Sequence, residues 1–189
     1  MEITFVLLAV LGVVVLIPLL VLWGIYNSLV AGRLKVKEAF SGIYVQLKRR
    51  ADLIPNLVTA VKGYTQHERE TLENLTRLRT EFLKVNPSDR SAVMEQGNML
   101  TQAMKSVFAV SENYPNLKAS ENFLKLQGSL EETEDQVAAA RRIYNANVND
   151  YNTSVQQFPS NVVAGWFKFA EETFFQTDQA LDEAPKVSF

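Results

Sequence analysis

The stretch of sequence that decides the fold runs from Phe123 to Phe158 and reads FLKLQGSLEETEDQVAAARRIYNANVNDYNTSVQQF. Positions along it recur at alternating steps of four and three residues, which is the spacing of one face of an α-helix. That face consists of Phe123, Gln127, Leu130, Glu134, Val137, Arg141, Tyr144, Val148, Tyr151, Val155 and Phe158. The pattern predicts one long helix that buries an apolar seam against other helices, as in a coiled coil.

Polar side chains interrupt this seam at three successive heptads, at Gln127, Glu134 and Arg141. A buried charge is costly unless it is paired and hydrogen-bonded, so we expect its partners on another helix. The residues predicted to form such an interhelical polar layer are Asp52, Asn56, Glu134, Arg141 and Asn145. The run 48–52 has two interpretations: it is solvated or faces lipid headgroups, or its acidic end joins this layer.

Apolar residues at the same spacing also precede this stretch and predict a helix that continues to about Lys84. They are Val36, Phe40, Ile43, Leu47, Ile54, Leu57, Val61, Tyr64, Leu72, Leu75, Leu78 and Phe82. Pro55 lies inside the series, and a proline in a helix removes a hydrogen bond and clashes with the preceding turn. Because the apolar phase does not shift across Pro55, we expect a kinked but continuous helix.

Two further helices are predicted, one on each side of the heptad stretch. The turn Asn86-Pro87-Ser88-Asp89 supplies an N-cap for a helix that ends near Asn113. Ser160 opens a last helix whose stripe consists of Val163, Trp166, Phe167, Ala170 and Phe174. This helix either caps the bundle or lies on a bilayer surface; Glu171 and Glu172 on its polar face speak against the second interpretation.

The N-terminal run from Ile3 to Ile25 has no charged residue and predicts a membrane-spanning helix. About 23 residues at 1.5 Å each cover the roughly 30 Å hydrocarbon layer. A cleaved signal peptide is the alternative, but the chain begins Met-Glu and no Ala-x-Ala site follows the run. Trp23 and Tyr26 lie at the far end of the span, where amphipathic rings prefer the headgroup level.

The flanks of this span predict its orientation. Only Glu2 precedes it, whereas Arg33, Lys35, Lys37, Lys48, Arg49 and Arg50 follow it. Basic flanks stay in the cytoplasm, so we expect a single-pass protein with its helical domain on the cytoplasmic side. The expected domains are an anchor over residues 1–30 and a helical bundle with a C-terminal capping helix over residues 31–189.

Composition excludes several classes of function. The 189 residues contain 19 Lys and Arg against 21 Asp and Glu, without the basic excess that binding nucleic acid requires. The chain has no Cys and one His, His67, and Thr71 stands where a zinc protease needs its second His. We therefore expect no metal, no cofactor, no evident small-molecule substrate and no enzymatic activity.

Several runs resemble one known family along almost the whole chain. They are Tyr26–Val30, Val45–Val58 (VQLKRRADLIPNLV), Val61–Tyr64, His67-Glu68, Ala140–Asn145 (ARRIYN), Tyr151-Asn152, Phe158-Pro159 and Ala184–Phe189 (APKVSF). On these residues the chain resembles the LemA family. The family commonly has a tryptophan near Phe40. This chain lacks it, and the difference alters only local packing.

The resemblance implies an all-α protein: an N-terminal transmembrane helix followed by an antiparallel bundle of long helices, in a bacterial inner membrane. It implies no reaction. The leading hypothesis is a membrane-anchored scaffold that self-associates through its helical domain and its membrane helix. The alternative is a membrane-anchored binding module that recruits other envelope proteins in stress response or protein quality control. The expected partners are therefore the lipid bilayer, copies of the same chain and other membrane proteins.

Overall fold

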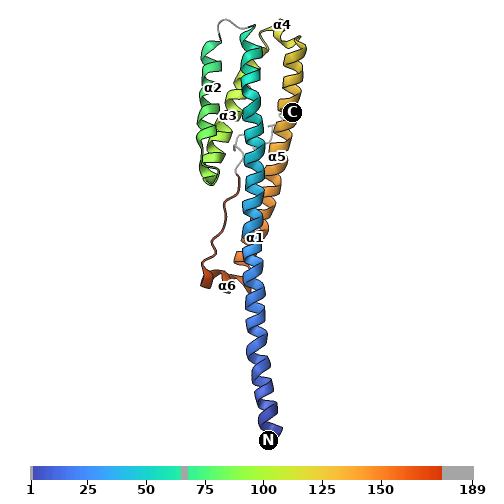
Figure 1. The fold of residues 1–189 in the computed structure, drawn as a ribbon, viewed down its shortest axis with the longest axis vertical. Coiled ribbons are helices and arrows are strands. Elements are labelled where there is room, and N and C mark those ends of the chain that lie inside the picture. Colours follow the sequence, from blue (N-terminus) through green and yellow to red (C-terminus); the bar gives the residue numbers. More distant parts are fainter. Residues whose placement is uncertain (1, 65–67, 176–189) are drawn as a thin grey trace, which may run out of the picture. The chain divides into compact units, whose positions relative to one another are not determined.

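The computed structural model describes residues 2–64 and 68–175, and these residues form helices joined by short connections (Figure 1). The helices are α1 (Glu2–Lys62), α2 (Arg69–Lys84), α3 (Arg90–Ser111), α4 (Pro115–Lys118), α5 (Glu121–Gln156) and α6 (Ser160–Phe167). No β-strand occurs in the described part of the chain, and the all-α prediction is confirmed. His67 and the run 184–189 lie outside the described residues.

The chain divides into two compact units. The anchor unit comprises residues 1–38 and 145–174, and the bundle unit comprises residues 39–144 together with the chain from Phe175. Helices α1 and α5 each contribute to both units.

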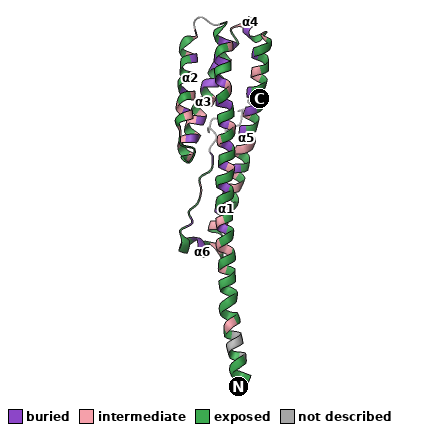
Figure 2. Ribbon diagram, in the orientation of Figure 1, coloured by how far each residue is buried: buried purple, intermediate pink, exposed green. Residues whose placement is uncertain are grey.

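In the bundle unit, α2, α3 and the adjoining parts of α1 and α5 lie side by side and alternate in direction (Figure 1). Their inner faces carry the buried residues, drawn in purple in Figure 2. The core includes Phe40, Ile43, Leu47, Ile54, Leu57 and Val61 of α1, Leu72, Leu75, Leu78 and Phe82 of α2, Val93, Leu100 and Val107 of α3, and Phe123, Leu130, Val137 and Tyr144 of α5. This arrangement is the antiparallel bundle that the resemblance to the LemA family implies.

The first predicted helix is shorter than expected. We expected it to continue to about Lys84, but α1 ends at Lys62 and α2 begins at Arg69. Gly63 and Tyr64 form a turn in which the Tyr64 N–H donates to the Val61 carbonyl at 3.0 Å. Glycine has a low helix propensity, and the break lets the apolar face of α2 fold back into the same core.

Helix α1 passes through Pro55 without interruption. Proline has no N–H, so the carbonyl of Ala51, one turn earlier, loses its helical donor. Arg79 of α2 supplies a replacement: its Nε donates to the Ala51 oxygen at 2.9 Å. The side chain of Arg79 thus satisfies a buried acceptor that Pro55 creates, and it attaches α2 to α1 at that level.

The other helices of the bundle unit follow the sequence closely. Asp89 caps α3, with its carboxylate accepting from the Ala92 N–H at 3.0 Å, and α3 ends at Ser111, close to the expected Asn113. Helix α5 covers most of the heptad stretch. The one-turn helix α4 was not predicted; Pro115 at its first position suits a helix start because that position needs no N–H donor.

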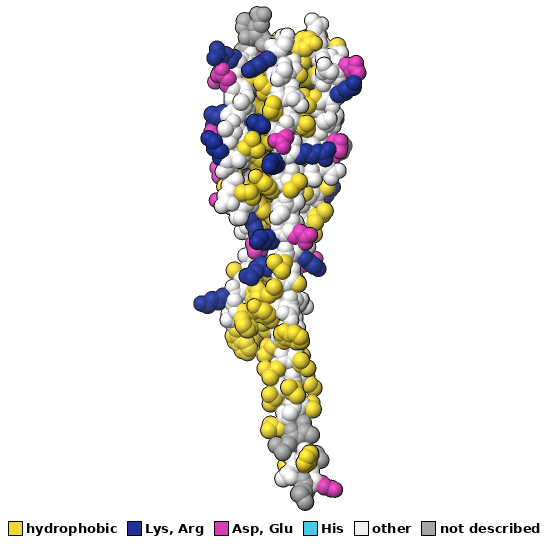
Figure 3. All heavy atoms as spheres, in the orientation of Figure 1, with side chains coloured by type: hydrophobic (Ala, Val, Ile, Leu, Met, Phe, Trp, Pro, Cys, Tyr) yellow, Lys and Arg dark blue, Asp and Glu magenta, His cyan; other side chains and the backbone are white. Residues whose placement is uncertain are grey.

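The anchor unit contains one helix of the described chain that is long and apolar enough to cross a membrane. Its best window has a mean hydropathy of 2.2 and is almost entirely exposed. Hydrophobic side chains cover the N-terminal part of α1 in Figure 3. Farther along, Gly32 permits a close approach of α5: a Cβ at this position would lie 3.2 Å from Cδ2 of Tyr151.

Helix α6 is also shorter than predicted. It ends at Phe167, so Ala170 and Phe174 do not continue its stripe. Lys168 adopts a left-handed conformation with φ 55°, and the N–H of Phe169 returns to the Ala164 carbonyl at 2.9 Å. The chain turns here because the Phe169 ring packs into a core with Leu29, Val163 and Ala164.

After α6 an extended segment is held against α5 by side-chain hydrogen bonds. Asn152 forms two of them with the backbone of Glu172: its Nδ2 donates to the Glu172 oxygen and its Oδ1 accepts from the Glu172 N–H, both at 2.8 Å. The hydroxyl of Tyr151 donates to the Ala170 oxygen at 3.0 Å. The backbone polar groups of an irregular segment are thereby satisfied without secondary structure.

Candidate functional site

The most polar point inside the bundle unit is Arg50, whose side chain is completely buried, with 0% exposure. It lies on α1 between the core residues Leu47 and Ile54. The steps from Leu47 to Arg50 and from Arg50 to Ile54 are three and four residues, so Arg50 occupies a regular position of the apolar seam.

Two helices, α3 and α5, provide the partners of the Arg50 guanidinium. Nη1 forms an ion pair with Glu134 of α5. Nη2 donates to the Thr101 hydroxyl at 2.8 Å and to the Gly97 carbonyl at 3.2 Å, both on α3. One side chain therefore connects α1, α3 and α5 at a single level and defines how the three helices are aligned along their axes.

Arg50 and Glu134 differ in how strongly each depends on the other. Burial lowers the pKa of the Arg50 guanidinium, while the charge of Glu134 and its hydrogen bond act in the opposite direction and raise that pKa. The Glu134 side chain is 47% exposed and remains hydrated in part. The cation thus depends on its partner more than the carboxylate does, because a buried charge without a counterion is the costlier state.

Gly97 provides the space that this centre requires. A Cβ at Gly97 would lie 3.0 Å from Cδ1 of Leu47, which is fully buried. The missing side chain lets α1 and α3 approach closely, and the Gly97 carbonyl accepts from both Arg50 and the Thr101 hydroxyl.

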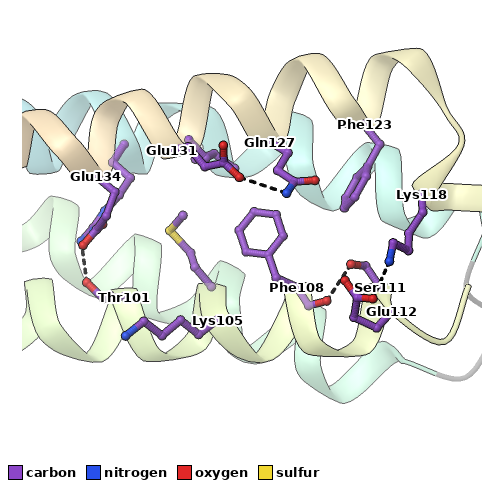
Figure 4. Close-up of a pocket in the computed structure, with 13 residues that line it drawn as sticks. Thr101, Lys105, Phe108, Ser111, Glu112, Lys118, Phe123, Gln127, Glu131 and Glu134 are labelled. Carbon is purple, nitrogen blue, oxygen red and sulfur yellow. Dashed lines mark hydrogen bonds and ion pairs between the residues drawn. The ribbon is translucent and has the colours of Figure 1, made fainter. Parts of the chain in front are cut away.

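A cavity of about 330 Å³ opens beside Arg50 between α3 and α5 (Figure 4). Its apolar surface comes from Met104, Phe108, Phe123 and Leu130. Polar groups surround it: the Arg50 to Glu134 ion pair, Lys105, an ion pair between Glu112 and Lys118, and a hydrogen bond from Gln127 to Glu131. An apolar recess with a few polar groups is the usual composition of a binding site.

The structure places the predicted polar-layer residues in different surroundings. Glu134 pairs with Arg50, whereas Asp52 and Asn56 lie on the exposed face of α1. Arg141 donates to Oδ1 of Asn98 at 3.2 Å, and its guanidinium lies 4.3 Å from the centroid of the Phe175 ring.

Asn145, the remaining member of the predicted layer, belongs to the anchor unit. Gln127, the first polar position of the seam, is half-buried and donates to Glu131 at 3.0 Å.

Sequence reasoning missed Arg50 as the buried partner, although a signal for it existed. The series on α1 steps from Leu47 to Ile54 with one position left out, and Arg50 fills it. Arg50 is a positive charge on the apolar seam of α1, and Glu134 is a negative charge on the apolar seam of α5. Their opposite signs allow the two residues to be paired from the sequence.

Comparison with known protein families matches residues 39–189 to the LemA family. The chain belongs to the LemA family. Outside this match lies most of the apolar N-terminal helix. Residues 45–58, which include Arg50 and Pro55, lie within the matched range.

Curated relatives of this LemA-family chain bear two kinds of name. "Protein LemA" of Metamycoplasma hominis is 26% identical over 153 residues, covering 81% of this chain and 69% of the relative. "Magnetosome protein MamQ 2" of Paramagnetospirillum magneticum is 25% identical over 181 residues, covering 83% of this chain and 66% of the relative. The chain thus spans about two thirds of the length of these proteins, and neither name describes an enzyme.

Proposed function

We propose that this LemA-family chain is a non-enzymatic, membrane-anchored structural protein that self-associates through its bundle and its membrane helix. The apolar N-terminal helix and the family assignment support the membrane anchor. The bacterial inner membrane is the location that the LemA resemblance implies. The basic residues Arg33, Lys35 and Lys37 on the bundle side of the span favour a cytoplasmic bundle.

The observation that carries self-association is a set of large apolar side chains that the bundle unit leaves exposed. They are Val45 on α1 and Leu124 and Ile143 on α5, each more than half exposed. Association of identical chains would remove this apolar surface from water at a gain of roughly 25 cal/mol per Å². Anchoring in a bilayer also confines the copies to one plane, which raises their effective concentration.

Cysteine cross-linking in native membranes tests this proposal, because the chain has no Cys and each engineered thiol is therefore unique. Val45→Cys, Leu124→Cys and Ile143→Cys are treated with a short bismaleimide, and Arg69→Cys, exposed on α2, serves as the control. Self-association predicts cross-linked dimers from at least one of the three apolar positions and none from the control. Monomers throughout would refute it.

A second candidate function is recruitment of another membrane protein, and the cavity beside Arg50 favours it. Its apolar surface has room for one or two large side chains, and its polar rim could orient a peptide. The same cross-linking experiment separates the two functions. A recruiter would yield adducts whose mass is not a multiple of this chain, from positions near the cavity such as Lys105→Cys.

A further inference from the structure

Helix α6 combines two properties that are unusual for a surface helix. Its sequence, SNVVAGWF, contains no charged residue. It buries only Val163 and Ala164, while Trp166 is 68% exposed and Phe167 and Val162 are also exposed. Phe158, in the turn that precedes α6, is 77% exposed. A cluster of exposed aromatic side chains on a water-soluble surface is costly and usually marks a contact site.

The position of α6 along α1 shows what this contact site faces. The core beneath α6 is built on Leu29, with Leu22, Ile25, Tyr26 and Val30 packed around it. Leu29 lies four residues beyond Ile25, where the predicted span ends, or about 6 Å along the helix at 1.5 Å per residue. The first charge after the span is Arg33, so α6 packs on the uncharged part of α1 that follows the apolar core of the span.

A bilayer has a headgroup layer at this level. The hydrocarbon core is about 30 Å thick and the whole bilayer about 40–45 Å, which leaves roughly 5–8 Å of headgroup region on each side. With the hydrocarbon boundary at Ile25, where the predicted span ends, the level of Leu29 falls within this layer. Tryptophan and phenylalanine favour the layer because their large rings tolerate its mixed polarity. In Figure 3 the hydrophobic surface of α1 continues over the region of α6.

The charges around α6 suit a lipid surface. Glu171 and Glu172 do not share a helical face with Trp166, because α6 ends at Phe167 and the backbone of Glu172 is held by Asn152. The exposed residue directly after the helix is Lys168. Arg33 lies over the Phe169 ring, 5.2 Å from its centroid, and so presents a cation just beyond the apolar core. Basic side chains at this depth interact favourably with lipid phosphates.

We propose that α6 and the preceding Phe158 form a membrane-contact collar that inserts Phe158, Val162, Trp166 and Phe167 into the headgroup layer of the bilayer that α1 spans. The collar adds a second point of contact beside the span and so restricts the tilt and depth of α1. This inference rests on the membrane anchor of the proposed function and is independent of self-association.

The chain offers a direct test because its two tryptophans are Trp23 and Trp166. Trp23→Phe leaves Trp166 as the sole reporter of the collar, and Trp166→Phe leaves Trp23 as the reporter of the span. The full-length variants are reconstituted in vesicles of phosphatidylcholine and phosphatidylglycerol. Fluorescence is then quenched with lipids that carry a nitroxide at the headgroup, at a shallow acyl position or at a deep one, and with aqueous acrylamide.

The collar predicts that Trp166 emits at shorter wavelength than a water-exposed indole, is quenched most by the headgroup and shallow nitroxides, and is protected from acrylamide. Quenching of Trp166 by acrylamide but not by nitroxide lipid would overturn the collar, provided Trp23 is lipid-quenched. Protection of Trp166 from both quenchers would also overturn it and indicate a protein covering α6. If Trp23 also escapes lipid quenching, the membrane anchor itself fails.

Discussion

Arg79 of α2 donates its Nε–H to the carbonyl oxygen of Ala51 in α1, at a distance of 2.9 Å. Ala51 is the residue whose helical hydrogen bond Pro55 removes, since a proline at position i cannot donate to the carbonyl at i−4. Pro55 is therefore the cause of a specific contact between α1 and α2.

This relationship predicts an energetic coupling between Pro55 and Arg79. Arg79→Met leaves the buried Ala51 oxygen without a donor and should lower the free energy of unfolding by about 1–3 kcal/mol. In a Pro55→Ala background the new N–H satisfies Ala51, so the same Arg79→Met change should cost clearly less. Denaturant unfolding in mild detergent provides the four values of the cycle. Equal costs in both backgrounds would contradict the account, and Arg77→Met, an exposed control, should have little effect.

The ion pair between Arg50 and Glu134 predicts that removing one member costs more stability than removing the other. Glu134→Ala leaves a completely buried cation without its counterion and should destabilise the bundle by about 3–5 kcal/mol. Arg50→Met leaves a carboxylate that water already reaches, and it should cost less. Glu132→Ala is the control, because its 3.7 Å pair with Arg49 is exposed and worth about 0–1 kcal/mol. Melting temperatures of the three variants measure the order; an Arg50→Met loss exceeding that of Glu134→Ala would contradict it.

Close packing at Gly97 predicts opposite effects for two identical substitutions. Gly97→Ala places a methyl group 3.0 Å from Leu47 in a filled core, an overpacking that costs about 1–3 kcal/mol and outweighs the gain in helix propensity. Gly128→Ala, on α5 with open space around it, should instead stabilise the protein by about 0.5–1 kcal/mol. Thermal unfolding of both variants tests this. A stabilised Gly97→Ala protein would show that Leu47 can move aside freely.

Tyr151 predicts a loss of stability in alkaline solution. Its pKa is raised chiefly by burial, with Arg33 acting in the opposite direction and Glu172 adding to the rise. A raised pKa means that the folded state favours the protonated phenol. That contribution is complete below the unfolded pKa of about 10 and is lost as pH rises through the folded value.

Tyr151→Phe, which cannot ionise, should therefore have a weaker decline of stability above about pH 10 than the parent chain. Tyr64→Phe, an exposed site, is the matched control and should follow the parent. Unfolding free energies measured between pH 8 and pH 11 test the difference, with the range chosen to bracket the tyrosine pKa of about 10. Parallel curves for all three proteins would show that ionisation of Tyr151 does not contribute to the loss of stability at high pH.

Much of the fold could be predicted because apolar spacing and caps are local signals. The seam of α5 and the cap at Asp89 correspond directly to the observed helices. The end of α6 could not be predicted, because the apolar pattern continues past Phe167. Lys168 takes a left-handed conformation without being glycine, and the decisive factor is the burial of Phe169 on Leu29, a contact between segments far apart in sequence.

The candidate site was predicted only in part. The charged positions on the α5 seam indicated that partners lie on another helix, and Glu134 has its partner on α1. The partner itself, Arg50, stands in a run of basic residues, where a single buried member cannot be separated from its exposed neighbours by composition. Only its place in the series between Leu47 and Ile54 distinguishes it from Arg49.

The measurement that tests self-association most directly is the molar mass of the full-length protein in mild detergent. Light scattering coupled to gel filtration gives the protein mass after the detergent contribution is subtracted. The account predicts one uniform species whose mass is two or more times 21.3 kDa, in whole multiples, and which persists on dilution. A mass of 21.3 kDa at every concentration would contradict the scaffold and leave recruitment of another protein as the function to test.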